Sequence, residues 1–169
     1  GSYLQDWMLL ETDYNWRVDA KQGGNSRAVA DIGSHWCDTV QFVTGKRIVE
    51  VMADLAIVWP VRKASIASNA TFGQQTADLQ FEDKAVTTED CGSVLVRFDD
   101  GSKGCFSVSQ VSAGRKNHLS FEINGSQSSL HWDQETPQQL WIGHRQQANQ
   151  ILTDDPGLMN ADVAASAHF

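Results

Sequence analysis

The chain has 169 residues, 41% of them hydrophobic and six of them tryptophan, so it can bury a core of ordinary domain size without disulfide bonds. Its 13 lysines and arginines against 21 acidic residues give a net charge of −8, which argues against nucleic acid as a partner. No apolar run reaches the about 20 residues of a membrane-spanning helix, and the three cysteines lack the spacing of a zinc site or disulfide framework, which favours a cytoplasmic protein.

The chain opens on Gly1-Ser2, which resembles the remnant of a cleaved expression tag, and we expect residues 3–169 to form a single domain. Residues 3–22, the aromatic segment, interleave aromatic rings with acids and amides. Rings pack against the C–H faces of a sugar while neighbouring polar groups bind its hydroxyls, so this segment is a candidate sugar-binding wall. The alternative is that Trp7 and its apolar neighbours only anchor the segment to the core.

Two glycines, Gly23 and Gly24, precede a segment whose pattern predicts a helix that ends at Gly45. Asn25 or Ser26 can supply the N-cap oxygen, and Gly45 suits the left-handed position after the last turn. The apolar residues of this segment recur at steps of three and four, the spacing of one buried stripe: Val29, Ile32, Trp36, Val40 and Val43.

A second stripe of the same predicted helix carries titratable groups. Asp31 and His35 are four residues apart, so an α-helix would stack them on one face, with Asp38 about a turn further on. A carboxylate beside an imidazole fixes the tautomer of the imidazole and raises its basicity, as a proton-transfer group near neutral pH requires. Two alternatives stay open: a surface pair that only supports the helix, and a metal site with Asp38, which the single imidazole disfavours.

Residues 47–58 alternate and predict a half-buried strand, with Val49, Val51 and Leu55 on the buried face, and Pro60 ends it. Residues 62–84 show no sustained period, so we expect a surface excursion without chemistry. From Asp90 onward, turn residues at 99–101 and at 124–125 separate short alternating runs, which predicts successive β-hairpins. The expected strands are 93–98, 104–111, 119–123, 129–132 and 139–142.

The fold class expected from these elements is α+β, a predominantly antiparallel open β-sheet with helices packed on one face. The apolar face that the alternation predicts consists of Val94, Val96, Phe98, Phe106, Val108, Leu119, Phe121 and Ile123. The opposite face is mixed and suits either water or a partner sheet: Leu95, Arg97, Cys105, Ser107, Ser109 and Glu122.

The spacing of Gly23-Gly24, Asp31, His35 and Asp38, preceded by Gln5-Asp6-Trp7 and Asn15-Trp16-Arg17, resembles the C-terminal domain of the Gfo/Idh/MocA family. This family comprises glucose–fructose oxidoreductase, inositol dehydrogenase and related NAD(P)-dependent sugar dehydrogenases. Further matching stretches cover nearly the whole chain, at residues 86–90, 109–117 and 121–126.

The resemblance implies the substrate-binding and catalytic half of an oxidoreductase that acts on a sugar, cyclitol or related polyol. NAD or NADP would be bound mainly by a preceding Rossmann domain, because this sequence has no GxGxxG turn and no Glu-Lys-Pro segment with the family's lysine. We therefore expect no cofactor-binding residue, and no metal ligand, in this chain, and we expect the chain alone to be inactive.

For the site, the resemblance implies that His35 accepts or relays the substrate hydroxyl proton while Asp31 orients the site. It implies that Gln5, Trp16 and Arg17 join Asp31 and His35 in binding substrate. It also implies a homo-oligomer formed through the open sheet face, without a membrane partner. The alternative function is a non-catalytic sugar-binding or assembly module with the same fold.

Overall fold

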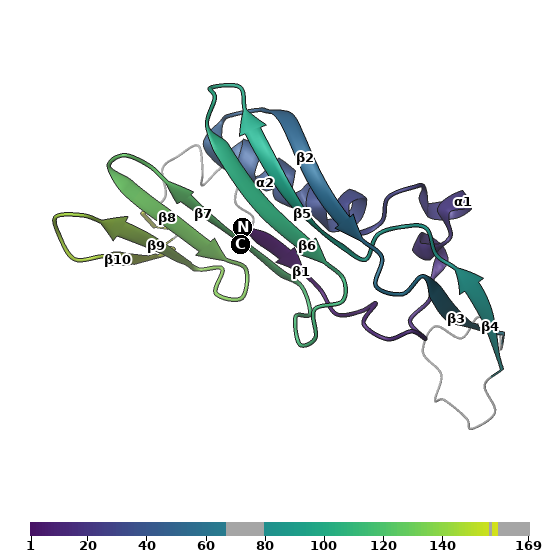
Figure 1. Cartoon of the computed structure of the whole chain (residues 1–169). Coiled ribbons are helices and arrows are strands. Elements are labelled where there is room, and N and C mark those ends of the chain that lie inside the picture. The colour runs from purple at the N-terminus through teal and green to yellow at the C-terminus, as the bar shows by residue number, and fades with distance from the viewer. Residues whose placement is uncertain (67–79, 156, 159–169) are drawn as a thin grey trace. The chain divides into compact units, whose positions relative to one another are not determined.

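The computed structural model describes residues 1–66, 80–155 and 157–158 of the chain. It consists of two compact units, Gly1–His118 and Leu119–Phe169. Strands dominate and helices are few, which confirms the expected α+β class with its open sheet (Figure 1). Among the described residues, no helix has the length and apolar character needed to cross a membrane.

The first unit is built on four strands in the order β1-β6-β5-β2. Their bounds are β1 (Ser2–Leu4), β2 (Ile48–Ala56), β5 (Cys91–Phe98) and β6 (Lys103–Ser109). The pair β5–β6 is the predicted antiparallel hairpin, β2 also pairs antiparallel with β5, and β1 lies parallel to β6 with Tyr3 opposite Val108. The predicted turn between β5 and β6 contains Gly101 at a φ of 83°, a conformation that glycine adopts without a steric penalty.

One face of this sheet is covered by the long helix that the sequence predicts (Figure 1). It consists of a π-helical segment, η2 (Val29–Gly33), followed without interruption by α2 (Ser34–Thr44). Trp36 stacks on Phe106 of β6 with ring centroids 4.3 Å apart. Gly33 allows the close approach, because a Cβ there would lie 3.3 Å from Val29 and 3.5 Å from Phe106 and Val108. Ile32, Trp36 and Val40 are buried, which confirms most of the predicted stripe, but Val43 is exposed.

The C-terminal end of the helix is as predicted, but its N-terminal end is not. Gly45 has the expected left-handed conformation, at a φ of 67°, and its N–H donates to the carbonyl of Gln41. The predicted N-cap by Asn25 or Ser26 is wrong, since no side chain of the preceding residues caps the helix. Instead, Glu89 Oε1 accepts hydrogen bonds from the backbone N–H groups of Arg27 and Val29, both at 2.9 Å.

The strand β2 is exposed from Val49 to Ala56, so the predicted half-burial of residues 47–58 is wrong. Val51 and Leu55 keep 66% and 48% of their surface exposed. The strand lies at the edge of the sheet, and every residue of it after Ile48 is exposed. Alternation alone could not reveal this, because it identifies a face and not the element that covers it.

Two strands form a separate antiparallel pair within the stretch that we expected to be a surface excursion: β3 (Val61–Ser65) and β4 (Phe81–Ala85). The expectation for residues 62–84 is therefore wrong at both ends, while residues 67–79 lie outside the described part. Arg62 of β3 is fully buried, and its guanidinium pairs with Asp90 at 2.6 Å. Two short helical turns, η1 (Trp16–Val18) and α1 (Ala20–Gly23), complete this unit. Met8, Val18 and Val86 form a small buried cluster beside them.

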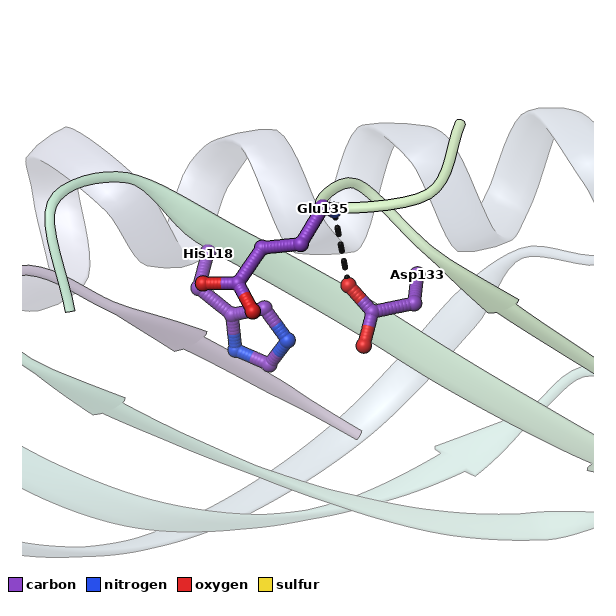
Figure 2. Close-up of side chains that lie close together, drawn as sticks. All are labelled: His118, Asp133 and Glu135. Atoms are coloured by element: carbon purple, nitrogen blue, oxygen red, sulfur yellow. Dashed lines mark hydrogen bonds between the residues drawn. The ribbon is translucent and has the colours of Figure 1, made fainter. Parts of the chain in front are cut away.

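The second unit is an antiparallel meander in the order β7-β8-β9-β10. Its strands are β7 (His118–Asn124, of which the first residue belongs to the first unit), β8 (Ser128–Asp133), β9 (Gln139–His144) and β10 (Gln150–Thr153). The first three were predicted, and β10 was not. Phe121 and Trp132 stack with centroids 5.7 Å apart. After β8, Asp133 Oδ1 accepts a hydrogen bond of 2.8 Å from the N–H of Glu135 and so closes the turn (Figure 2).

Candidate functional site

The aromatic segment presents a cation between two indole rings. Asn15 Oδ1 accepts from the N–H of Arg17 at 2.9 Å and caps the short turn η1 that carries both Trp16 and Arg17. The Arg17 guanidinium lies 4.7 Å from the ring centroid of Trp16 and 5.7 Å from that of Trp7, within cation–π range. In the described part of the chain, no carboxylate pairs with this guanidinium, so its N–H donors remain available to an oxygen-rich ligand.

Beside this cation lies a pocket of about 200 Å³ whose lining includes Trp16, Arg17 and Asp31. Three of the five predicted site residues therefore share one concave surface. Trp16 is 53% exposed, so one indole face is open to a ligand. A guanidinium, an aromatic face and a carboxylate are the groups that bind a polyhydroxylated ring.

Asp31 lies in the π-helical segment η2, and its carboxylate is held by a residue that the sequence did not reveal. Gln110 Nε2 donates to Asp31 Oδ2 at 2.9 Å. Gln110 follows β6 and has no exposed surface, whereas Asp31 is half-buried at the pocket. The amide therefore approaches the carboxylate from the protein interior and leaves its outer side accessible.

His35 is exposed one turn further along, and its ring centroid lies 6.1 Å from that of Tyr3. Among the described residues, no hydrogen bond or ion pair joins His35 to Asp31, so the expected direct pairing of the two is not observed. Asp31 lies in the π-helical segment η2, in which hydrogen bonds run from residue i to i+5, as from the N–H of Ser34 to the carbonyl of Val29. Its carboxylate binds Gln110 Nε2 instead of His35.

Gln5 is the centre of a polar network beneath the two candidate catalytic groups. Its Oε1 accepts from Trp7 Nε1 at 2.5 Å, and its Nε2 donates to Asn117 Oδ1 at 2.9 Å. The hydroxyl of Tyr3, whose ring neighbours His35, donates to the same oxygen at 2.8 Å. Gln110 Nε2 also lies 3.5 Å from Gln5 Oε1. A chain of contacts therefore connects the surroundings of Asp31 with those of His35.

The five predicted site residues thus all lie in the first unit. Sequence reasoning missed Tyr3, Gln110 and Asn117 as partners of these residues. Gln110 and Asn117 are in the stretch 109–117 that carried part of the resemblance, but no pattern assigned them a contact. Asp38, the third group of the metal alternative, is exposed, and the ligand atoms of Asp31, His35 and Asp38 do not gather within 4.8 Å of one another in the described structure.

Other reactive groups near the site are already engaged or unsuited to chemistry. Lys116 pairs with Asp6 at 2.7 Å, and this hydrogen bond lowers the pKa of Asp6 against the opposing effect of burial. The three cysteines are free thiols. Burial raises the pKa of Cys37, and burial together with a neighbouring carboxylate raises that of Cys91, so neither is a ready thiolate nucleophile.

Comparison with known proteins agrees with the resemblance. A family model described as the GFO/IDH/MocA C-terminal domain matches residues 1–131. The levoglucosan dehydrogenase of Pseudarthrobacter phenanthrenivorans is 27% identical over 143 residues, which are 84% of this chain and 36% of that protein. The crystal structure of an oxidoreductase domain protein from Kribbella flavida has a TM-score of 0.75 at 32% identity, covering 90% of this chain and 39% of that chain.

A solved levoglucosan dehydrogenase, in complex with NADH and levoglucosan, matches with a TM-score of 0.73 at 23% identity, covering 92% of this chain and 39% of that chain. At that identity the likeness shows a shared fold. The chain spans about two fifths of the length of these relatives.

Proposed function

The chain belongs to the GFO/IDH/MocA C-terminal domain family, and from this membership we propose that it is the substrate-binding and catalytic part of an NAD(P)-dependent oxidoreductase. Its substrate is a sugar, cyclitol or related polyol that loses hydride from a secondary alcohol carbon. Two observations support the substrate class: the similarity to a levoglucosan dehydrogenase and the pocket that Trp16, Arg17 and Asp31 line.

NAD or NADP, when bound, accepts the hydride. The sequence contains no glycine-rich GxGxxG turn between a strand and a helix, so this chain lacks the groups that hold a dinucleotide pyrophosphate. We therefore place the nucleotide outside this chain. The exposed His35 and the half-buried Asp31 suit the reacting end of such a site, because both are accessible from solvent on one helix.

The residues of this chain orient the substrate and handle its proton. The substrate ring packs against the open face of Trp16, and Arg17 donates hydrogen bonds to its oxygens. Asp31 accepts a hydrogen bond from a second hydroxyl of the substrate and so fixes the position of the carbon that reacts. His35 accepts the proton of the reacting hydroxyl. Its Nε2 or Nδ1 is available for this step, since His35 makes no hydrogen bond to the described residues.

The observation that carries this proposal is the set of polar contacts by which Gln110 joins Asp31, a lining residue of the pocket, to Gln5. A carboxylate and an amide fixed from the interior are pre-organised for binding, which lowers the entropic cost of orienting a substrate. A solvated surface pair on a helix would have no such support.

The proposal predicts that His35→Ala, made in the complete protein, lowers turnover by at least tenfold while cofactor affinity stays within about twofold. The expected range follows from general acid–base catalysis, which contributes about 10²–10⁴-fold. Asp38→Ala, an exposed side chain on the same helix, is the matched control and should keep wild-type turnover. Steady-state kinetics with a panel of sugars and inositols, together with NADH fluorescence titration, measure both quantities.

Near-normal turnover of His35→Ala would remove this residue from the mechanism. A protein that binds sugars but turns none of them over, with or without the substitution, would favour the non-catalytic module instead.

We also propose that the protein forms a homo-oligomer through the open face of its sheet, the face opposite α2. On this face Met52, Leu95 and Cys105 lie side by side on β2, β5 and β6. Met52 and Leu95 are 66% and 52% exposed, and the three residues line a hollow of about 500 Å³. Apolar side chains gathered on an exposed sheet are typical of a surface that packs against another subunit.

A further inference from the structure

The backbone of Gln110 is held by a hydrogen bond at its N–H group and another at its carbonyl. Its N–H donates to the carbonyl of Asp90, and its carbonyl accepts from the N–H of Met8, both at 3.0 Å. Asp90 is itself fully buried and bound by two arginines. The Cα of Gln110 therefore has a defined position between two elements of the first unit, and its side chain has no exposed surface.

The side-chain amide is oriented by a carboxylate. Gln110 Nε2 donates to Asp31 Oδ2, and Gln110 Oε1 is buried without a hydrogen-bond partner among the described residues. Exchanging the two amide atoms would bring an oxygen within 2.9 Å of the carboxylate oxygen, which is repulsive. The observed orientation therefore gives the Asp31 carboxylate a hydrogen-bond donor and leaves Gln110 Oε1 without a partner among the described residues. Buried polar groups are rarely left unpartnered in proteins, and exceptions concentrate at functional sites.

Asp31 needs such a support because its own helix does not provide one. Among the described residues, no hydrogen bond joins its carboxylate to His35, and Gln110 is the one hydrogen-bond partner of that carboxylate. Without the amide, the half-buried carboxylate could rotate about its side-chain bonds. Misplacement of a catalytic group by a fraction of an ångström lowers the rate without preventing binding.

Resting on the proposed function, we propose that Gln110 is a positioning residue, which fixes the Asp31 carboxylate for the reaction and couples it to Gln5 of the aromatic segment. Gln110 does not touch the substrate. It acts from the interior through Nε2, which contacts the carboxylate of Asp31 and the amide oxygen of Gln5.

The test uses Gln110→Met in the complete protein, since methionine matches the length of glutamine and removes the amide. We expect kcat to fall at least tenfold while KM changes less than threefold. Gln41→Met is the matched control: this half-buried glutamine also makes a side-chain hydrogen bond, of 2.8 Å to the N–H of Ile48, but lies at the far end of α2. It should keep wild-type kcat. If the methionine variant does not fold, Gln110→Glu replaces it in the test. This substitution keeps the shape of the side chain and places a second carboxylate against Asp31, and the same fall in kcat is expected.

A double-mutant cycle with Asp31→Ala separates positioning from a general structural effect. Because Gln110 acts through Asp31, replacing it in the Asp31→Ala background should change kcat less than twofold. If the two losses simply multiply, the proposal for Gln110 is overturned. If Gln110→Met retains kcat while Asp31→Ala and His35→Ala lose it, only this inference fails. If Asp31→Ala and His35→Ala both retain kcat, the proposed function fails with it.

Discussion

The carboxylate of Asp90 accepts four hydrogen bonds from three parts of the first unit. Its Oδ1 accepts from Arg27 and Arg62, and its Oδ2 accepts from the N–H groups of Val58 and Trp59. Burial alone would raise the pKa of this carboxyl, but its arginine partners and a backbone amide outweigh burial, so the pKa lies below its ordinary value. The carboxylate thus joins the start of the long helix, the strand β3 and the end of β2.

We predict that Asp90→Asn lowers the free energy of unfolding by about 3–5 kcal/mol, because it leaves two buried guanidinium groups without their counter-charge. Urea denaturation followed by tryptophan fluorescence measures this loss. Asp83→Asn, which removes an exposed partner of Lys63, is the control and should cost less than about 1 kcal/mol. Equal effects of the two substitutions would contradict the importance of burial.

The same residue predicts a pH dependence. An aspartate of the unfolded chain titrates near about 3.9, and the folded pKa of Asp90 lies lower. Its ionised form therefore contributes stability that is complete above the unfolded pKa and is lost as pH falls through the folded one. The wild-type protein should lose more stability than Asp90→Asn between pH 5 and the acid transition.

For individual residues, the sequence predicts part of the candidate site. Asp31 and His35 were identifiable from their spacing, and Trp16 and Arg17 from the mixture of rings and polar groups. Gln110 was not, because it lies 79 positions from Asp31 and no local pattern encodes such a contact. The lack of a hydrogen bond between Asp31 and His35 was also hidden, because their spacing places them on one helix face but does not show which group binds the carboxylate.

Among the elements, the long helix depends on a cap supplied from a distant part of the chain. Glu89 Oε1 accepts from the N–H groups of Arg27 and Val29 and from Ser26 Oγ. Glu89 is 5% exposed, and its carboxylate lies at the positive end of the helix dipole. The start of the helix is therefore fixed by the residue that directly precedes Asp90.

We predict that Glu89→Ala destabilises the protein by about 1–3 kcal/mol, because one buried and two part-buried donors lose their acceptor. Hydrogen exchange of the Arg27 and Val29 amides should accelerate more than that of amides in the middle of α2. Glu82→Ala removes an exposed carboxylate that pairs with Lys84 and is the control, expected to leave stability nearly unchanged. Unchanged exchange at the helix start would show that another group caps it.

The hairpins β5–β6 and β7–β8 were the elements easiest to predict, because glycine-containing turns and alternation mark both partners of each pair. The strand β1 was not predictable, since three residues cannot establish a period. The pair β3–β4 was missed for a related reason. In the sequence, Arg62 of β3 indicates a surface position, because arginine is charged. In the structure its side chain is fully buried and paired with Asp90.

For the whole molecule, the proposed oligomer gives a test with an internal control. Met52 and Val51 are neighbours on β2 with the same exposed fraction, 66%, but they point to opposite faces of the sheet. We predict that Met52→Glu converts the oligomer to monomer in sedimentation velocity, whereas Val51→Glu leaves it intact. A wild-type protein that is monomeric at micromolar concentration, or equal effects of both substitutions, would rule out this interface.

The way Arg62 binds the aromatic segment has a consequence for which residues of that segment can vary. Its guanidinium donates to three main-chain carbonyls of that segment, those of Met8, Leu10 and Asp13, at 2.8–2.9 Å. Every amino acid offers such a carbonyl, so the anchor is indifferent to which side chains the segment carries. Substitutions at Trp16 and Arg17, which line the pocket, therefore leave this attachment in place, and under the proposed function libraries randomised at residues 16 and 17 should yield folded proteins with altered sugar preference.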